Sequence, residues 1–264
     1  MEKFPQKASI SGRKYVTILG VRVDGTELAE VLSKIVQKID SEAKFYIVTP
    51  NPEIILKAQN DKKLREALNS ADFSIADGFG LKIAEPSLPI VRGRELMGNL
   101  CKMAKDANWK VFFLGGTKDA NARAIKNAKL FYNSINIKGE AGPTLDPDGE
   151  PISEVDTKIQ FDVLDKIGII QPDILFVGFG CPKQEKWVYR NFKKLNAKCI
   201  MVVGGAIDYL AGVAKLPPAW MESLGLEWLW RLFNEPERFG RIINAVVLFP
   251  LLVLISSFRH KKGH

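Results

Sequence analysis

The run DILFVGFG, residues 173–180, is apolar along most of its length and ends in two glycines around a phenylalanine. A short apolar run of this kind is typical of a strand that is buried on both faces of a parallel sheet. The same pattern of strand and then glycine occurs in KVFFLGG (110–116) and in KCIMVVGG (198–205), and a helical stretch follows each run. This alternation predicts an α/β fold with a doubly wound, mostly parallel sheet.

The N-terminal half of the chain follows the same alternation. KYVTILGVRV (14–23) is typical of a strand or hairpin, and FYIVTP (45–50) of a strand. Asn51 is a preferred N-cap residue and Pro52 suits the first helical position, so a helix is expected to begin there. The other predicted elements are a strand at FSIAD (73–77) and helices at 27–39, 94–107, 119–132 and from Pro182 onward.

Glycine-rich turns follow three strands at their predicted carboxyl ends, where open α/β sheets bind ligands. Backbone amides in such turns bind phosphate well, so Gly115-Gly116, Gly178–Gly180 and Gly204-Gly205 together favour a nucleotide-type ligand. None of them completes a known motif, because Lys183 stands where the dinucleotide motif has glycine and no P-loop sequence occurs. Each turn taken alone is more simply explained as a tight connection between strand and helix.

The composition excludes several classes of protein. The 264 residues are 46% hydrophobic and carry a net charge of +8, which is typical of a globular protein with a bias toward anionic partners. No nucleic-acid motif accompanies the charge, so nucleic acid is not expected as a partner. The only histidines, His260 and His264, lie at the C-terminal end, so neither a Ser-His-Asp apparatus nor a histidine-ligated zinc is expected.

The cysteines and the N-terminal residues indicate the kind of cellular compartment in which the protein is expected. Cys101, Cys181 and Cys199 are odd in number and widely spaced, which predicts a reducing compartment without disulfides. Residues 1–14 contain no apolar segment, so no signal peptide is expected.

Asp77 is the leading candidate for a catalytic group. It ends the strand in FSIADGFG (73–80), where glycines leave room for a substrate. A partly desolvated carboxylate there can act as a general base, but an Asx-turn or a helix N-cap explains it equally well. Thr49 and Asn51 end the preceding strand and are expected at the same edge. Asp208, after the third glycine-rich strand, is a weaker candidate, for substrate binding.

The polar loop 141–156 contains Asp146-Pro147-Asp148, which superficially fits the Asp-x-Asp of metal-dependent nucleotide-sugar enzymes. Pro-Asp-Gly is a common turn, however, and the turn is the favoured interpretation. No metal and no other cofactor are expected.

The composition changes near residue 217, which predicts an α/β core over 1–216 and a helical appendage over 217–264. Three tryptophans cluster after the boundary, and residues 242–258 carry no charge but are interrupted by Asn244 and Pro250. Basic residues flank this run, as expected of a helix at an anionic membrane interface. A core helix, an oligomer contact and a membrane span, which needs about 20 residues, are the alternatives.

Several blocks of the chain resemble the WecG/TagA/CpsF glycosyltransferases. The resemblance runs from about residue 15 to 241 and is carried jointly by five blocks. These are TPNPEIILKAQND (49–61), SADFSIADGFG (70–80), FVGFGCPKQEKW (176–187), VGGAIDYLAG (203–212) and GLEWLWRLFNEPERFGR (225–241).

The resemblance implies a Rossmann-like α/β fold with a C-terminal appendage that completes the site at the membrane. It implies a metal-independent, inverting transfer of a sugar from a UDP-sugar donor to polyprenyl-diphosphate-linked GlcNAc. N-acetylmannosamine is the sugar we expect, with glucose or N-acetylmannosaminuronate as alternatives. The expected location is the cytoplasmic face of the cell membrane, peripheral or monotopic. A non-catalytic nucleotide-sugar-binding scaffold remains an alternative, and homo-oligomerisation stays open.

The same resemblance assigns roles to individual residues. Asp77 would be the general base. The positions expected around the substrates are Thr49 and Asn51 for sugar and acceptor, Gly115, Gly116, Lys183, Gln184 and Glu185 for the nucleotide-sugar, and Arg231, Arg238 and Arg241 for diphosphate charge.

One stretch departs from the family pattern. The family usually has Glu-Arg-Val followed shortly by Gly-x-Asp-Leu, whereas this chain has EPSLPIVRGRELM (85–97). Ile90 stands three residues before Gly93, where the family has arginine, and Glu95 replaces the aspartate. Arg92, assigned to substrate binding, or Arg94 is expected to take over the role of the arginine.

Overall fold

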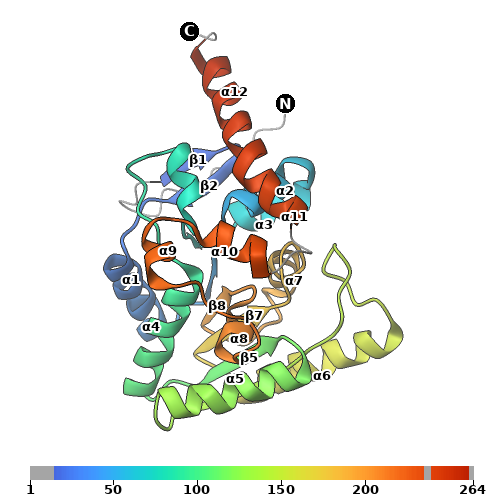
Figure 1. Ribbon diagram of the computed structural model, residues 1–264. Coiled ribbons are helices and arrows are strands. Elements are labelled where there is room, and N and C mark those ends of the chain that lie inside the picture. The colour runs from blue at the N-terminus through green and yellow to red at the C-terminus, as the bar shows by residue number, and fades with distance from the viewer. Residues whose placement is uncertain (1–14, 235–238, 262–264) are drawn as a thin grey trace.

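The computed structural model describes residues 15–234 and 239–261 (Figure 1). Its centre is a six-stranded sheet with the order β4-β3-β8-β7-β5-β6, in which every neighbouring pair is parallel. The strands are β3 (Phe45–Val48), β4 (Phe73–Ser74), β5 (Val111–Gly115), β6 (Ile137–Glu140), β7 (Ile174–Gly178) and β8 (Cys199–Val202), and a separate antiparallel hairpin joins β1 (Tyr15–Ile18) to β2 (Val21–Asp24).

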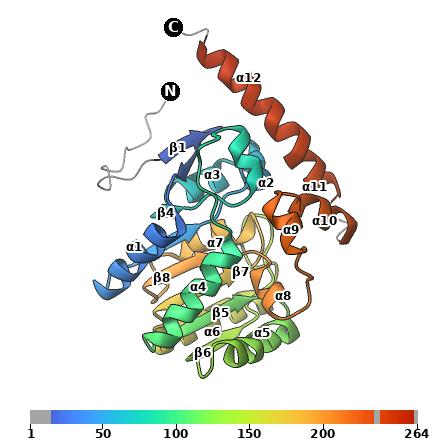
Figure 2. The ribbon, with the colours of Figure 1, turned by 60° about the vertical axis from the view of Figure 1, so that its left-hand side comes forward.

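Helices cover both faces of the sheet, which confirms the predicted doubly wound, Rossmann-like arrangement. Alternate residues of one strand enter two separate cores: Phe112 and Leu114 of β5 lie in one, Val111 and Phe113 in the other. The first core is completed by α2 (Pro52–Asn60), α3 (Lys62–Asn69), α6 (Glu154–Ile170) and α7 (Lys183–Asn191). The second is completed by α1 (Leu28–Asp40), α4 (Gly93–Asp106), α5 (Lys118–Phe131) and α8 (Ala206–Leu210), and Figure 2 shows α4 crossing that face of the sheet.

The predicted N-cap at Asn51 is confirmed. Its side-chain Oδ1 accepts a hydrogen bond of 3.0 Å from the backbone N–H of Ile54, and Pro52 is the first residue of α2. Because the cap fixes where α2 begins, it also fixes the path of the chain between β3 and the helix.

The strand predicted at 73–77 is shorter than expected. Only Phe73 and Ser74 form β4. The next residue keeps single contacts on both sides: the N–H of Ile75 donates to the Val48 carbonyl at 2.8 Å, and Ile75 forms an isolated bridge with Asp24 of the hairpin. The Asp24 carboxylate also accepts from the N–H of Ser74 at 2.9 Å. The chain then turns through a 3-10 helix at Phe79–Ile83. Asp77 therefore lies in the loop between β4 and this turn and does not end a long strand.

The described residues from 217 onward, which the sequence predicts to form an appendage and which we refer to by that name, fold into short helices and one longer helix. They are α9 (Ala219–Ser223), α10 (Glu227–Asn234), α11 (Phe239–Ile243), a π-helical segment at Asn244–Leu248 and α12 (Phe249–Lys261). The helix is continuous from Phe239 to Lys261, and its type changes to π at Asn244 and back to α at Phe249, next to Pro250. Figures 1 and 2 show α12 extending away from the core, although Phe249 and Val253 near its start are buried against the first core. No helix among the described residues has the length and hydropathy that a membrane crossing requires.

Candidate active site

The residues expected to bind sugar and acceptor lie together at the carboxyl edge of the sheet. The backbone N–H of Asp77 donates to the carbonyl of Pro50 at 3.0 Å, between Thr49 and Asn51. One residue earlier, the carbonyl of Ala76 accepts from Val91 at 2.9 Å, which brings the start of α4 to the same place. Two backbone bonds thus hold three loops from distant parts of the sequence around one half-buried carboxylate.

Glycines let these loops approach closely. A Cβ at Gly93 would lie 3.3 Å from Thr49 Oγ1, and a Cβ at Gly78, whose φ is +101°, would lie 3.8 Å from Asn51 Cβ. Thr49 itself is buried. Asp77 therefore lies beside Thr49, Asn51 and the start of α4, as expected of a base next to a sugar pocket, and its assignment as base stays a prediction.

The three glycine-rich turns form a second, adjoining part of the edge. Gly115 pairs with Gly178 across β5 and β7, and a Cβ on Gly178 would come within 2.9 Å of the Gly204 carbonyl. A Cβ on Gly116 would lie 3.7 Å from Asp208 Oδ1, so this carboxylate stands close to the first turn. The expected gathering of the three turns at one sheet edge is confirmed.

Gln184 joins two of these turns through hydrogen bonds. Its Oε1 accepts from the backbone N–H of Gly180 at 3.2 Å and from that of Gly204 at 3.0 Å, and its Nε2 donates to Glu185 Oε1 at 2.8 Å. The side chain is buried. In this structure Gln184 sets the relative position of the turns after β7 and β8, and its role at a nucleotide-sugar stays a prediction.

Glu185 lies in the protein interior and not on the open edge, with 1% of its surface exposed. Burial raises the pKa of its carboxyl above the usual range, in spite of the hydrogen bond from Gln184. Burial likewise raises the pKa of the neighbouring Cys181 thiol, and the Glu185 charge adds to the effect. By accepting the hydrogen bond from Gln184 Nε2, the Glu185 carboxyl orients the amide whose oxygen holds the two turns.

Glu185→Gln should change the pH dependence of stability. An acid whose pKa is raised on folding favours the folded state at low pH, and the free energy of unfolding falls as pH rises above its ordinary pKa of about 4.3. Glutamine keeps the acceptor oxygen but never ionises. We therefore expect the melting temperature of the variant, relative to wild type, to be higher at pH 8 than at pH 5. An equal difference at both pH values, as expected for the exposed control Glu42→Gln, would contradict this role.

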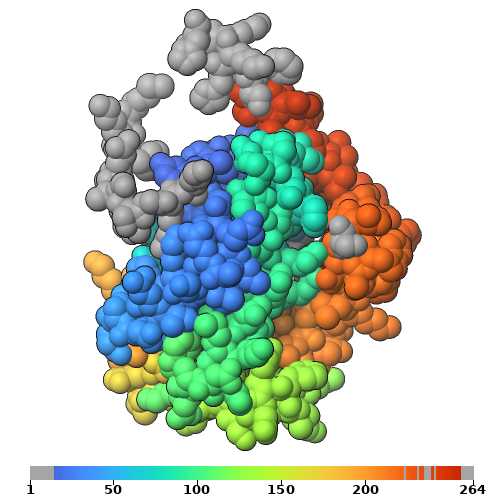
Figure 3. All heavy atoms as spheres, turned by 90° about the vertical axis from the view of Figure 1, so that its left-hand side faces the viewer, coloured from blue at the N-terminus to red at the C-terminus, as the bar shows by residue number. Residues whose placement is uncertain are grey.

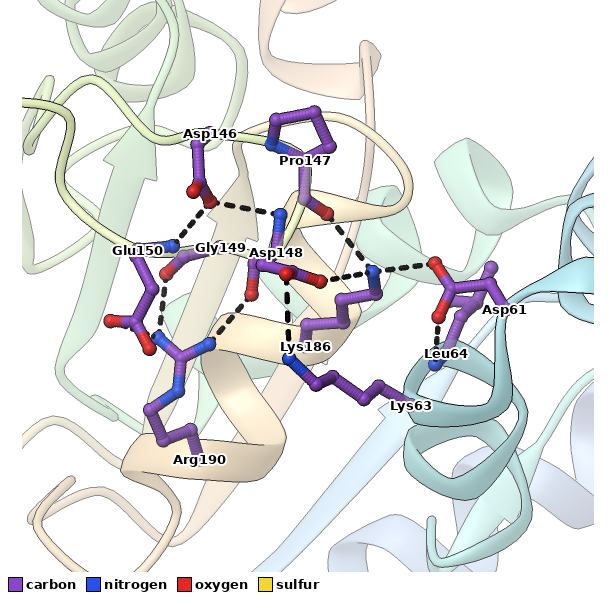
Figure 4. Close-up of polar contacts among 10 residues, drawn as sticks. All are labelled: Asp61, Lys63, Leu64, Asp146, Pro147, Asp148, Gly149, Glu150, Lys186 and Arg190. Atoms are coloured by element: carbon purple, nitrogen blue, oxygen red, sulfur yellow. Dashed lines mark hydrogen bonds and ion pairs between the residues drawn. The ribbon is translucent and has the colours of Figure 1, made fainter.

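The loop 141–156 is tied to α7 and α3 by ion pairs (Figure 4). Asp146 Oδ1 accepts from the N–H groups of Asp148 and Glu150 at 2.8 and 2.9 Å, which is the turn expected for this sequence. Lys186 Nζ lies 2.9 Å from Asp148 and 2.5 Å from Asp61. Hydrogen bonds from Lys186 and Lys63 lower the pKa of Asp148. These aspartates therefore hold the loop in place, and no cluster of metal-binding side chains occurs among the described residues.

Lys183 also serves this loop. Its ammonium donates to the carbonyl of Leu145 at 3.2 Å, which directs the charge toward the loop. A role of Lys183 at a nucleotide-sugar stays a prediction.

The arginines considered for substrate binding fall into two groups. Arg92 and Arg94 lie at the start of α4 and form ion pairs with Glu222 and Glu227 of the appendage. Of the other three, Arg238 lies outside the described residues, as do the side chains of Arg231 and Arg241.

Sequence reasoning missed Asn121, which supports the first glycine turn. This buried side chain of α5 donates from Nδ2 to the carbonyls of Gly115, Glu140 and Phe113 at 2.8, 3.0 and 3.2 Å. It ties the end of β5 to the end of β6. The sequence does carry a sign of this role, because Asn121 is a polar residue among the alanines of the buried face of α5.

Known proteins are similar to nearly the whole of this chain in sequence. The model of the glycosyl transferase WecG/TagA/CpsF family matches residues 16–263. Proteins from Staphylococcus aureus strains MRSA252 and MW2 are each 30% identical over 255 residues, covering 94% of this chain and 95% of the relative. Both are named N-acetylglucosaminyldiphosphoundecaprenol N-acetyl-beta-D-mannosaminyltransferase.

Proposed function

Because the chain belongs to the WecG/TagA/CpsF family and is therefore a glycosyltransferase, we propose that it transfers N-acetylmannosamine from its UDP-sugar to polyprenyl-diphosphate-linked GlcNAc. The observation that carries the proposal is the match of almost the whole chain to mannosaminyltransferases that act on such an acceptor. The placement of Asp77 beside Thr49 and Asn51, next to the glycine turns, supports it.

The proposed reaction is a single in-line displacement with inversion. The Asp77 carboxylate takes the proton from an acceptor hydroxyl, the acceptor oxygen forms a bond to the anomeric carbon of the donor, and the bond from that carbon to the UDP oxygen breaks. Inversion needs only one base, so one well-placed carboxylate suffices. Arginine side chains would stabilise the charge that develops on UDP, in place of a metal ion.

We also propose that the appendage rests on the membrane that holds the acceptor, at its cytoplasmic face. The described part of α12 exposes Leu251, Leu254 and Ile255, and the sequence places Arg259, Lys261 and Lys262 after them. Apolar side chains followed by basic ones suit the headgroup region of an anionic bilayer.

A turnover assay tests the proposed activity. The full chain should transfer N-acetylmannosamine from its UDP-sugar to a lipid-linked GlcNAc analogue, and EDTA should leave the rate unchanged within about twofold, because no metal takes part. Mass spectrometry of products from UDP-N-acetylmannosamine, UDP-glucose and UDP-N-acetylmannosaminuronate identifies the donor. Loss of turnover in EDTA would contradict the metal-free reaction, and UDP binding without turnover of any donor would favour a scaffold.

A further inference from the structure

The turn between α9 and α10 lies against the two loops that flank Asp77. We call residues 222–227, with the sequence ESLGLE, the docking turn. At its centre, a Cβ on Gly225 would lie 2.8 Å from Cγ and 2.9 Å from Cβ of Phe79, two residues after Asp77. The φ of Gly225 is +71°, which favours glycine, so the turn can approach this ring closely. Figure 3 shows the orange surface of the appendage lying against the teal and green surface that leads into α4.

Both ends of the docking turn are held by the start of α4. Arg92 Nε lies 2.5 Å from Glu227 Oε1, and Arg92 also donates to the backbone carbonyl of Glu222 at 2.9 Å. Arg94 lies 2.5 Å from Glu222 Oε1 and 3.2 Å from Glu227 Oε2. The docking turn is thus fixed at three points, by two arginines and by the ring of Phe79.

The loops that the docking turn contacts also form the surroundings of Asp77. The backbone N–H of Val91 donates to the carbonyl of Ala76 at 2.9 Å, which joins the start of α4 to the residue before Asp77. On the other side, a Cβ at Gly80 would lie 2.7 Å from Pro52 Cγ, so the 3-10 turn after Asp77 lies against the start of α2. Because these loops pack against one another, the contacts of the docking turn affect the position of Asp77.

The charges of Arg92 and Arg94 are offset by the docking turn. Burial pushes the pKa of Glu227 upward, but the charge of Arg94 and the hydrogen bonds from both arginines outweigh it, so the pKa lies below its usual value. The paired side chains are 19–24% exposed, so each ion pair is partly shielded from water and gains more than a surface pair. Little net positive charge is therefore left at the arginines for a substrate anion.

The cavity beside these ion pairs is separate from the catalytic edge. Its volume is about 520 Å³, and its lining consists of apolar side chains of α4, α5 and α8 together with both arginines, Glu222 and Glu95. Among the described residues that border it, none is Thr49, Asn51 or Asp77. Two carboxylates balance the two guanidinium groups, so the cavity has no excess of positive charge that would attract a diphosphate.

We propose that Arg92 and Arg94 are positioning residues that hold the docking turn on the loops beside Asp77, and that they do not bind substrate. This role differs from the substrate contact expected for Arg92 from the sequence. Glu222 and Glu227 are positioning residues in the same sense, because they act through the arginines. The inference rests on the proposed function only for its effect on turnover.

The direction of the effect of Glu222→Gln distinguishes docking from substrate binding. If Arg94 holds the docking turn, Glu222→Gln and Arg94→Gln should both raise the amide exchange rate of residues 219–234 about three- to tenfold, and both should lower kcat/KM. The double variant should be no worse than Arg94→Gln, because the two changes break the same ion pair. If Arg94 instead binds a substrate anion, Glu222→Gln frees it and keeps or raises kcat/KM, which would overturn the proposal. Glu140→Gln breaks the exposed pair with Lys166 and is the control.

Gly225→Ala tests the docking turn without removing a charge. The new methyl group would meet Phe79 at its Cβ and Cγ, where rotation of the ring gives no relief, so we expect faster exchange of residues 219–234 and a loss of kcat/KM of about threefold or more. Gly212→Ala is the matched control, since the φ of Gly212 is also +71° but no atom beyond its chain neighbours lies within 4 Å of a Cβ there. Equal exchange of residues 219–234 in the two alanine variants would contradict the contact with Phe79.

Amide exchange is measured without substrate, so it does not depend on the proposed function. Faster exchange in the variants of a chain that transfers no sugar would overturn only the proposed function. Faster exchange with the turnover of wild type would overturn the role of the arginines in the reaction, and lower turnover with unchanged exchange would overturn their role in docking. An equal rise of exchange in β3, β7 and β8 would indicate a general loss of stability and would also overturn the proposal.

Discussion

Asp77→Asn should lower kcat by about 10²–10⁴-fold, which is the usual contribution of a general base, while the Kd of the UDP-sugar stays close to that of wild type. The backbone of Asp77 is bonded to the loop that carries Thr49 and Asn51, and that of Ala76 to the start of α4, whereas the glycine turns expected to bind the nucleotide follow other strands. Loss of the base should therefore affect the chemical step and not donor binding. Initial rates at saturating donor and calorimetry with UDP-sugar measure the two quantities separately.

The substitution Asp77→Asn also distinguishes a catalytic role of Asp77 from a structural role in the turn. Asn and Asp cap helices and turns about equally well, so the variant keeps any capping by residue 77 before the 3-10 helix at Phe79–Ile83. Asp106→Asn, at the exposed end of α4, is the matched control and should retain full turnover. A rate for Asp77→Asn within a few-fold of wild type would remove Asp77 from the role of base.

The strands and helices of the core could be predicted from the sequence, because apolar runs and helix caps involve residues that are close together in the chain. The runs that form β5, β7 and β8 are continuously apolar, and the cap at Asn51 is a hydrogen bond to a residue only three positions further along the chain. The segments β6 and α6 gave no comparable signal. In β6 only Ile137 is buried, and α6 buries few of its side chains along its length, so neither shows the periodicity that sequence reasoning depends on.

The residues of the candidate site that follow the ends of parallel strands could be predicted from the sequence. The ion pairs between segments far apart in the chain could not. Parallel strands bring their carboxyl ends together, so Thr49, Asp77 and the glycine turns could be expected at one edge. The pairing of Arg92 and Arg94 with Glu222 and Glu227 crosses about 130 residues and depends on where the appendage packs. The interior position of Glu185 likewise depends on how α7 packs against the sheet, although its neighbour Gln184 reaches two turns.

Gly115→Ala should destabilise the protein by roughly 3–5 kcal/mol, among the largest effects that one methyl group can have. The φ of Gly115 is +121°, which side-chain-bearing residues rarely adopt, and a Cβ there would lie 2.5 Å from the Gly178 carbonyl oxygen. The atom in the way is backbone of the neighbouring strand and cannot rotate aside, so β5 and β7 would have to separate at the residues that pair there. Urea unfolding followed by circular dichroism measures the loss.

The same change should also weaken UDP binding, because separating β5 from β7 moves two of the three glycine turns apart. Gly168→Ala is the matched control: it adds a methyl group to the last turn of α6, where no atom other than the helix's own backbone lies within 4 Å of the new Cβ. Alanine is the better helix former, so this variant should gain about 0.5–1 kcal/mol and bind UDP as wild type does. If Gly115→Ala unfolds at the same urea concentration as wild type, the close approach of β5 and β7 at this pair is wrong. If the variant is destabilised but binds UDP with the affinity of wild type, UDP binding does not depend on the turn after β5.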